Sequence, residues 1–181
     1  MIYHLSLHAI GLITGAVLVL LSLLAIFLPA QSFLPKFPRS RLAGAVLLTL
    51  DLVWSFWILA TMEMGEFSNF RRPLLIALPI GFFLVLRFVD EFLAVRALGI
   101  LCLLAAEPLL DAAFLRPEGS RLLVTVFAYL MIIAGLFWVT MPYLLRDQIN
   151  WSTSKPGRWR LLSGIGFAVG AAMLVCAFVS Y

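Results

Sequence analysis

The chain has 181 residues, of which 64% are apolar and only 12% are charged, and its mean hydropathy is +1.08. A soluble domain is about half apolar and about a quarter charged, so this composition excludes a water-soluble folded core. The net charge of +4 does not indicate nucleic-acid binding, because the 13 basic residues lie mainly at the ends of apolar segments and form no polar face.

Six apolar segments follow one another along the chain, separated by short connections. Each is about twenty residues long, the length at which a helix crosses roughly 30 Å of hydrocarbon. We therefore predict an all-α integral membrane protein, a single transmembrane domain over residues 1–181 built as a bundle of about six helices with short loops. The predicted spans are 7–28, 42–62, 73–92, 94–115, 122–145 and 161–181. The junction between the third and fourth spans contains no proline or glycine, so a five-span arrangement stays open.

Lys and Arg are distributed unevenly between the two sets of loops. Loops two and four hold Arg71, Arg72, Arg116 and Arg121. Loops one, three and five hold the larger set: Lys36, Arg39, Arg41, Arg87, Arg96, Arg146, Lys155, Arg158 and Arg160. Because basic loops stay in the cytoplasm, we expect a bacterial inner membrane protein with both termini outside the cytoplasm.

The two halves of the chain, 1–92 and 94–181, share faint landmarks. The Phe-Trp pair at 56–57 has a counterpart at 137–138, and the Ile-Gly-Phe run at 80–82 has one at 165–167. Three spans in each half would place the halves in opposite orientations, as in many transporters. A weak inverted repeat is therefore an open hypothesis.

Asp51 lies at the middle of the second predicted span, where a charge costs about 2.5–3.5 kcal/mol on insertion scales. Trp54, Ile58 and Thr61 fall on the same helical stripe, so we expect this face to turn toward protein. One interpretation is a proton or cation site with an aromatic wall. The other is a buried hydrogen bond between helices, for which Asp51 needs a donor.

Glu107 and Asp111 are four residues apart and share a face of the fourth predicted span. Two ionised carboxylates this close repel each other in a low dielectric, so protonation or pairing is expected for at least one of them. Together with Asp51, they are the candidates for an ion or proton site. The alternative is that Asp111 lies near enough to the outer surface to be solvated.

A second charged group stands at the junction of the third and fourth spans. Arg87, Asp90 and Glu91 have the i, i+3 and i+4 spacing at which a guanidinium reaches a carboxylate on its own helix, and Arg96 follows. We interpret these four residues as an ion-paired cluster at the membrane interface, and the alternative is a gate for a transported ion.

Two glycine pairs, Gly11 with Gly15 and Gly166 with Gly170, have the G-x-x-x-G spacing that lets another helix backbone approach closely. They are the candidate helix-packing residues. The sequence contains no catalytic, nucleotide-binding or metal-binding signature, so we expect no catalytic residue, no cofactor and no metal site.

Two classes of function fit these features. The first is an accessory or scaffold subunit of a larger membrane complex, whose partners are membrane lipids and other transmembrane subunits or further copies of itself. The second is a small proton- or cation-coupled transporter or channel that uses Asp51, Glu107 and Asp111. The first is the preferred hypothesis, because short loops and the lack of a soluble domain leave the chain little to do alone.

Overall fold

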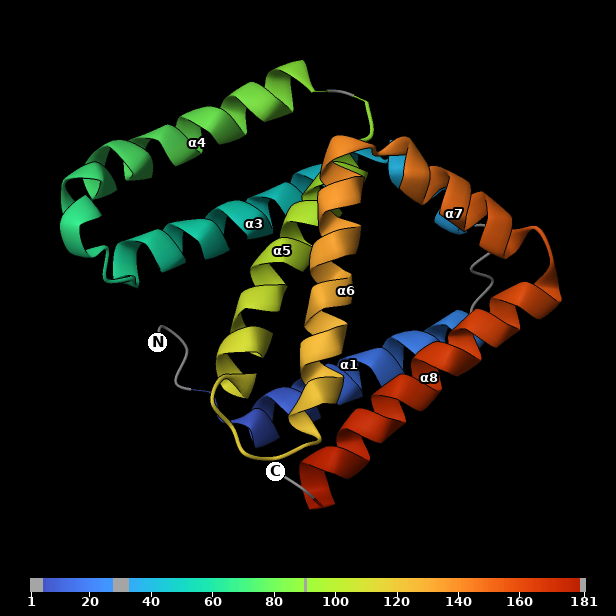
Figure 1. The fold of residues 1–181 in the computed structure, drawn as a ribbon. Helices are drawn as coiled ribbons and strands as arrows, with labels where there is room; N and C mark the ends of the chain where they lie inside the picture. Colours follow the sequence, from blue (N-terminus) through green and yellow to red (C-terminus); the bar gives the residue numbers. More distant parts are fainter. Residues whose placement is uncertain (1–4, 28–32, 90, 180–181) are drawn as a thin grey trace.

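The computed structural model of the protein describes residues 5–27, 33–89 and 91–179, and these form an all-helical fold without strands (Figure 1). In chain order the elements are α1 (Leu7–Phe27), the 3-10 helix η1 (Leu34–Arg39), α3 (Arg41–Thr61), the 3-10 helix η2 (Gly65–Phe70), α4 (Arg71–Phe88), α5 (Leu93–Ala113), α6 (Arg121–Thr140), α7 (Tyr143–Thr153) and α8 (Pro156–Val179).

Within the described ranges, six helices are long and apolar enough to cross a membrane, namely α1, α3, α4, α5, α6 and α8. This confirms the prediction of six long apolar helices. The break between α4 and α5 is made at Phe92, whose φ of 56° lies in the left-handed region. A residue with a side chain adopts this conformation at a cost of about 1–2 kcal/mol, and Phe92 packs against Val95, Leu145 and Ile149. The turn is therefore held by tertiary contacts, which a search for proline and glycine does not detect.

The fifth predicted span is wrong at its end. Residues 122–145 do not form one helix, because α6 stops at Thr140 and α7 begins at Tyr143. Pro142 explains the break: it disfavours a helical conformation for Met141, whose φ and ψ are −127° and 70°. The sequence prediction also missed α7, which was taken for part of a span and a loop.

α1 and α8 pack as an antiparallel pair along a stripe of small residues. A Cβ added at Gly15 would lie 2.9 Å from the carbonyl oxygen of Gly170, and one added at Gly170 would lie 3.0 Å from that of Gly15. A Cβ at Gly166 would meet Ser22 Oγ at 2.7 Å. Gly11 is buried on the same helix as Gly15. Three of the four candidate packing glycines therefore lie at direct contacts between these two helices.

Hydrogen bonds between side chain and backbone join both ends of this pair. At one end, Nδ1 of His8 lies 2.7 Å from the carbonyl oxygen of Ala177 and donates to it. At the other end, Nε1–H of Trp159 donates to the carbonyl oxygen of Ala25 at 2.7 Å. Both hydrogen bonds join α1 to α8, and they lie at opposite ends of the helix pair. Together they position α8 against α1 along its length.

α5 and α6 form a second antiparallel pair with the same kind of contact. A Cβ at Gly99 would lie 2.9 Å from the carbonyl oxygen of Gly135, and a Cβ at Gly135 would lie 2.8 Å from that of Gly99. Ala106 and Ala128 continue the interface and are almost completely buried. This pair was not predicted from the sequence, although Gly99, Ala106 and Ala113 recur at every seventh residue of α5.

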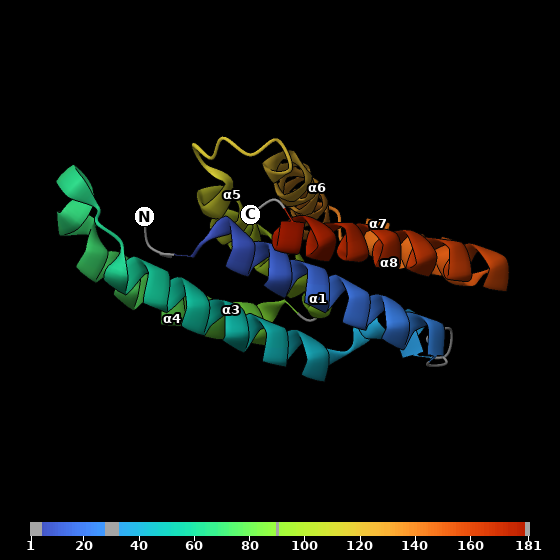
Figure 2. The same cartoon turned by 90° about the horizontal axis from the view of Figure 1, so that it is seen from below.

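α5 is the helix to which the other pairs attach. The first residues of α3 meet its beginning, where a Cβ on Gly44 would lie 2.8 Å from the backbone nitrogen of Ala94. The first residues of α1, Leu7 and Ile10, pack instead near the end of α5, against Leu109. Because each contact involves only one end of a helix, the pairs α1/α8 and α3/α4 splay away from α5/α6 at a steep angle (Figures 1 and 2).

The loops expected in the cytoplasm meet at one end of the molecule. Leu34 and Phe37 of η1, Phe92 of the α4–α5 turn, and Leu145 and Ile149 of α7 all belong to one apolar cluster. Basic residues occur in η1, in α7 and in the first turn of α8, and two of their side chains lie over aromatic rings. The guanidinium carbon of Arg146 lies 5.9 Å from the centre of the Phe92 ring, and that of Arg158 lies 4.8 Å from the Trp151 ring.

Candidate functional site

Asp51 is buried where α3, α4 and α5 come together, with only 3% of its surface exposed. Neither carboxylate oxygen has a hydrogen-bond partner among the described residues. The expectation that Asp51 faces other helices therefore holds, but the expected donor is not found in the part of the chain that the structure describes. A buried carboxylate without a partner is costly in protein and more so in a membrane.

Beside Asp51 runs a groove of about 330 Å³ between α3 and α4, closed on one side by Ile100 of α5. We call it the Asp51 groove. Its walls are almost entirely apolar, and Ser55, one helical turn after Asp51, adds a hydroxyl. The lining residues are Leu48, Asp51, Leu52, Ser55, Leu74, Ala77, Leu78, Gly81, Phe82, Val85 and Ile100.

The small residues of the groove were not identified from sequence. Ser55 follows Asp51 at i+4, and Ala77 and Gly81 of α4 lie at i and i+4 across from them. This spacing places each pair on one helical face. The sequence signal was present, but it could be read only with knowledge that α4 is the helix facing α3.

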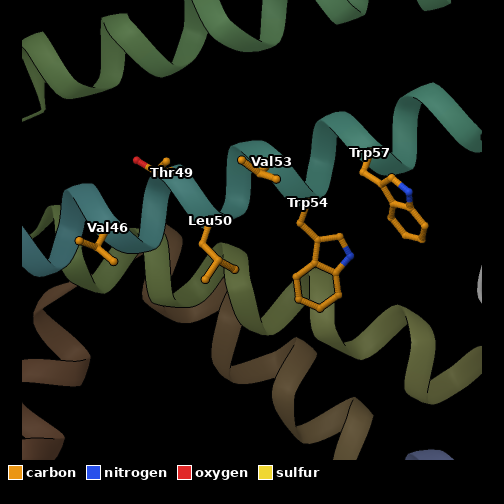
Figure 3. A pocket seen from close by; sticks show the side chains of 6 residues that line it. All are labelled: Val46, Thr49, Leu50, Val53, Trp54 and Trp57. Atoms are coloured by element: carbon orange, nitrogen blue, oxygen red, sulfur yellow. The ribbon is translucent and has the colours of Figure 1, made fainter.

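The aromatic wall predicted for Asp51 lies elsewhere. Trp54 lines a different hollow together with Trp57, along another face of α3 (Figure 3). All residues that line this hollow belong to α3, and most are strongly exposed, including Val53 at 64%. The ring that does line the Asp51 groove is Phe82 of α4. Asp51 and Trp54 therefore lie in two different hollows, although both belong to the helical stripe that was predicted to face protein.

Glu107 and Asp111 lie together, as their spacing predicts, but away from Asp51. Both line a shallow hollow of about 390 Å³ on α5, with Phe114 at its edge and Ile132 of α6 opposite. Glu107 is exposed and Asp111 is half-buried. No residue lines both this hollow and the Asp51 groove.

The three acids predicted as an ion or proton site therefore fall into two places. Among the described residues, no group of three His, Cys, Asp or Glu side chains is arranged to hold a metal ion. A single site built from Asp51, Glu107 and Asp111 is not the observed arrangement. Of the three acids, Asp51 is the one that is buried, lies beside an open groove and has no hydrogen-bond partner among the residues that the structure describes.

The charged cluster at the α4–α5 junction stays a prediction. Arg87 and Glu91 are exposed and Arg96 is half-buried, and no ion pair joins these three in the described part of the chain. Asp90 lies outside the described residues. The Nε of Arg96 is buried without a hydrogen-bond partner among the described groups. The ion pair that is observed nearby joins Arg146 to Asp147 on α7, at 2.9 Å.

Comparison with known proteins provides no further guide to this arrangement. No protein-family model matches the chain, and searches of curated proteins and of solved structures find no significant match.

Proposed function

We propose that the chain is an accessory subunit of a larger membrane complex and that its α3/α4 hairpin is the part that contacts other subunits. The observation that carries this proposal is the exposure of α4. None of the 18 residues of α4 is buried, whereas each of the other five long apolar helices buries at least three residues.

This difference has a physical meaning in a bilayer. Lipid tails are as apolar as leucine, so helices in a membrane associate through close packing and polar contacts and not through the hydrophobic effect. The pairs α1/α8 and α5/α6 have such packing at their glycine contacts. α4 has none comparable, because a Cβ on its only glycine, Gly81, would meet nothing within 4 Å. Packing from another subunit would position this helix.

The splayed arrangement of the helix pairs supports the same proposal. A bundle of roughly parallel helices is the usual way to span a bilayer, whereas α3/α4 lies at a steep angle to α5/α6 (Figure 1). Partner helices that pack beside α4 would complete a bundle that the chain alone begins.

The proposal predicts that extraction in mild detergent yields an assembly with fixed stoichiometry. An Ile80→Trp substitution on exposed α4 should release the chain from this assembly, because a larger side chain disrupts close packing. Size-exclusion chromatography with light scattering and subunit quantification provides the measurement. Leu130→Trp, at an exposed position of α6, is the matched control and should leave the assembly intact. A wild-type chain that elutes as a monomer or homodimer, and that conducts ions in proteoliposomes, would favour the transport hypothesis instead.

We further propose that the end of the molecule where η1, Phe92 and α7 meet lies in the cytoplasm, which places both termini outside. The support is the concentration of basic residues on these elements, because basic loops are retained in the cytoplasm. A reporter that is active only in the cytoplasm should give no signal when fused after Tyr181. The same reporter inserted after Ser154, between α7 and α8, should be active. The reverse pattern would overturn the orientation.

A further inference from the structure

The Asp51 groove has one ionisable side chain in an otherwise almost apolar lining. Asp51 is buried, with both carboxylate oxygens unpartnered among the described residues, and Ser55 is the other polar side chain in the lining. Leucine, alanine and valine side chains and Phe82 form most of the remaining wall. A group that fits this groove must neutralise a carboxylate and place apolar atoms against the walls.

A metal ion does not meet these requirements. Ca²⁺ takes six to eight oxygen ligands, and Mg²⁺ keeps near-octahedral oxygen coordination. Asp51 supplies two oxygens and Ser55 one, and no cluster of three metal-ligating side chains occurs in the described ranges. A Lys or Arg side chain does meet them, since its aliphatic stem lies along apolar surface while its charged head seeks a polar partner.

The position of the groove determines how such a side chain would arrive. The groove lies between α3 and α4, and none of the residues of α4 is buried. A partner helix that lies against α4 can therefore insert one long side chain between α3 and α4 toward Asp51.

Arg96, the basic residue of α5, is not paired with Asp51 in the part of the chain that the structure describes. It lies about one helical turn before Ile100, which lines the groove. Arg87 is exposed in the last turn of α4. The cation that would satisfy Asp51 is thus best supplied from outside the chain.

We infer that the Asp51 groove receives a Lys or Arg side chain from a transmembrane helix of another subunit, which forms an ion pair with Asp51. This inference rests on the proposed function as a subunit and names the recognition chemistry at its contact. Ion pairing with the buried carboxylate gives the contact its specificity, because a partner helix without the cation leaves Asp51 unsatisfied.

Site-specific photocrosslinking in native membranes tests the inference. A photoreactive residue replaces Leu78, which lines the groove, or Phe83, which is exposed on α4 and outside the groove lining. From position 78 we expect a crosslinked peptide from a different protein, with a Lys or Arg inside an apolar segment. The Asp51→Asn substitution should reduce this product by about tenfold or more, because the cation of the partner would then remain buried without its counter-ion. The probe at Phe83 should be insensitive to this substitution.

Matched variants separate the ion pair from general effects on folding. Asp51→Glu retains the charge and should retain the crosslinked product. Glu107→Gln changes an acid outside the groove, and Arg96→Gln removes the basic residue of α5. The last two should also retain the product. Crosslinks from position 78 to lipid only, to a second copy of this chain, or to a peptide without a basic residue would overturn the inference. This outcome does not depend on whether the Asp51 variants fold.

The two proposals fail in distinguishable ways. If the wild-type chain purifies in a stable assembly, but the peptide captured from position 78 lacks a basic residue, the ion-pair inference is wrong and the subunit proposal stands. If the wild-type chain purifies without partners, the subunit proposal itself is wrong.

Discussion

Replacing Gly170 by alanine is expected to lower the free energy of unfolding by about 1–3 kcal/mol, which is the usual effect of overpacking a filled interior. The new Cβ would lie 2.9 Å from the Cβ of Leu18 and from the backbone nitrogen of Val19, and 3.0 Å from the carbonyl oxygen of Gly15. Two of these three atoms belong to the backbone of α1, so rotating a side chain cannot relieve the contact. The helices must separate, which weakens the packing along the stripe.

Gly164 provides a control on the same helix. A Cβ at Gly164 meets nothing within 4 Å, so Gly164→Ala should leave packing unchanged and stabilise α8 by roughly 0.5–1 kcal/mol through helix propensity alone. The two substitutions are chemically identical and should have effects of opposite sign. Equilibrium unfolding of the purified protein in detergent, followed by circular dichroism, measures both. Equal effects would show that α1 and α8 do not meet at Gly170.

The paired helices illustrate which parts of the fold the sequence can predict. Apolar length alone predicted the six long helices, because each helix in a bilayer must satisfy its own backbone hydrogen bonds. The G-x-x-x-G spacing also identified Gly15 and Gly170 as packing residues. It did not reveal that they contact each other, since α1 and α8 come from opposite ends of the chain. Pairing between distant helices depends on surface shape, which local sequence does not encode.

The missed features have the same origin. The turn at Phe92 has no glycine or proline, and its left-handed conformation is held by contacts with η1 and α7. α7 itself is a short helix in which Leu145 and Ile149 are buried. Its 11 residues contain too few turns for the apolar periodicity in the sequence to distinguish a helix from a loop. Both elements depend on tertiary contacts that form only when three separate loops meet.

For the candidate site, the mid-span position of Asp51 predicted its burial, because an ionised group facing lipid there is too costly. The sequence predicted a donor for the same reason, and the described part of the chain supplies none. The sequence also could not predict that Asp51 lies apart from Glu107 and Asp111, since that depends on which face of α5 meets α3. A residue pattern predicts that a polar group needs a partner, but not whether the same chain provides it.

Replacing Asp51 by leucine is expected to change stability in opposite directions in the isolated chain and in the assembly. In the isolated chain, the substitution removes a buried carboxylate that has no partner among the described residues, and the adjacent groove of about 330 Å³ has room for the larger side chain. Exchanging buried charges for apolar residues often stabilises by about 1–4 kcal/mol, so the free energy of unfolding in detergent should rise by an amount in this range. Thr49→Leu, on an exposed position of the same helix, is the control and should stay within about 0.5 kcal/mol.

In native membranes the same Asp51→Leu variant should be recovered less often in the assembly, because the cation of the partner would lose its counter-ion and remain buried and unpaired. A structural acid with a donor inside its own chain would behave differently, since removing it would lower the stability of the isolated chain as well. Measuring both quantities on one variant therefore separates the two roles. If the variant is more stable but is not recovered in the assembly, Asp51 serves a partner subunit at the expense of the stability of its own fold. If the variant is less stable, Asp51 is paired with a group of its own chain.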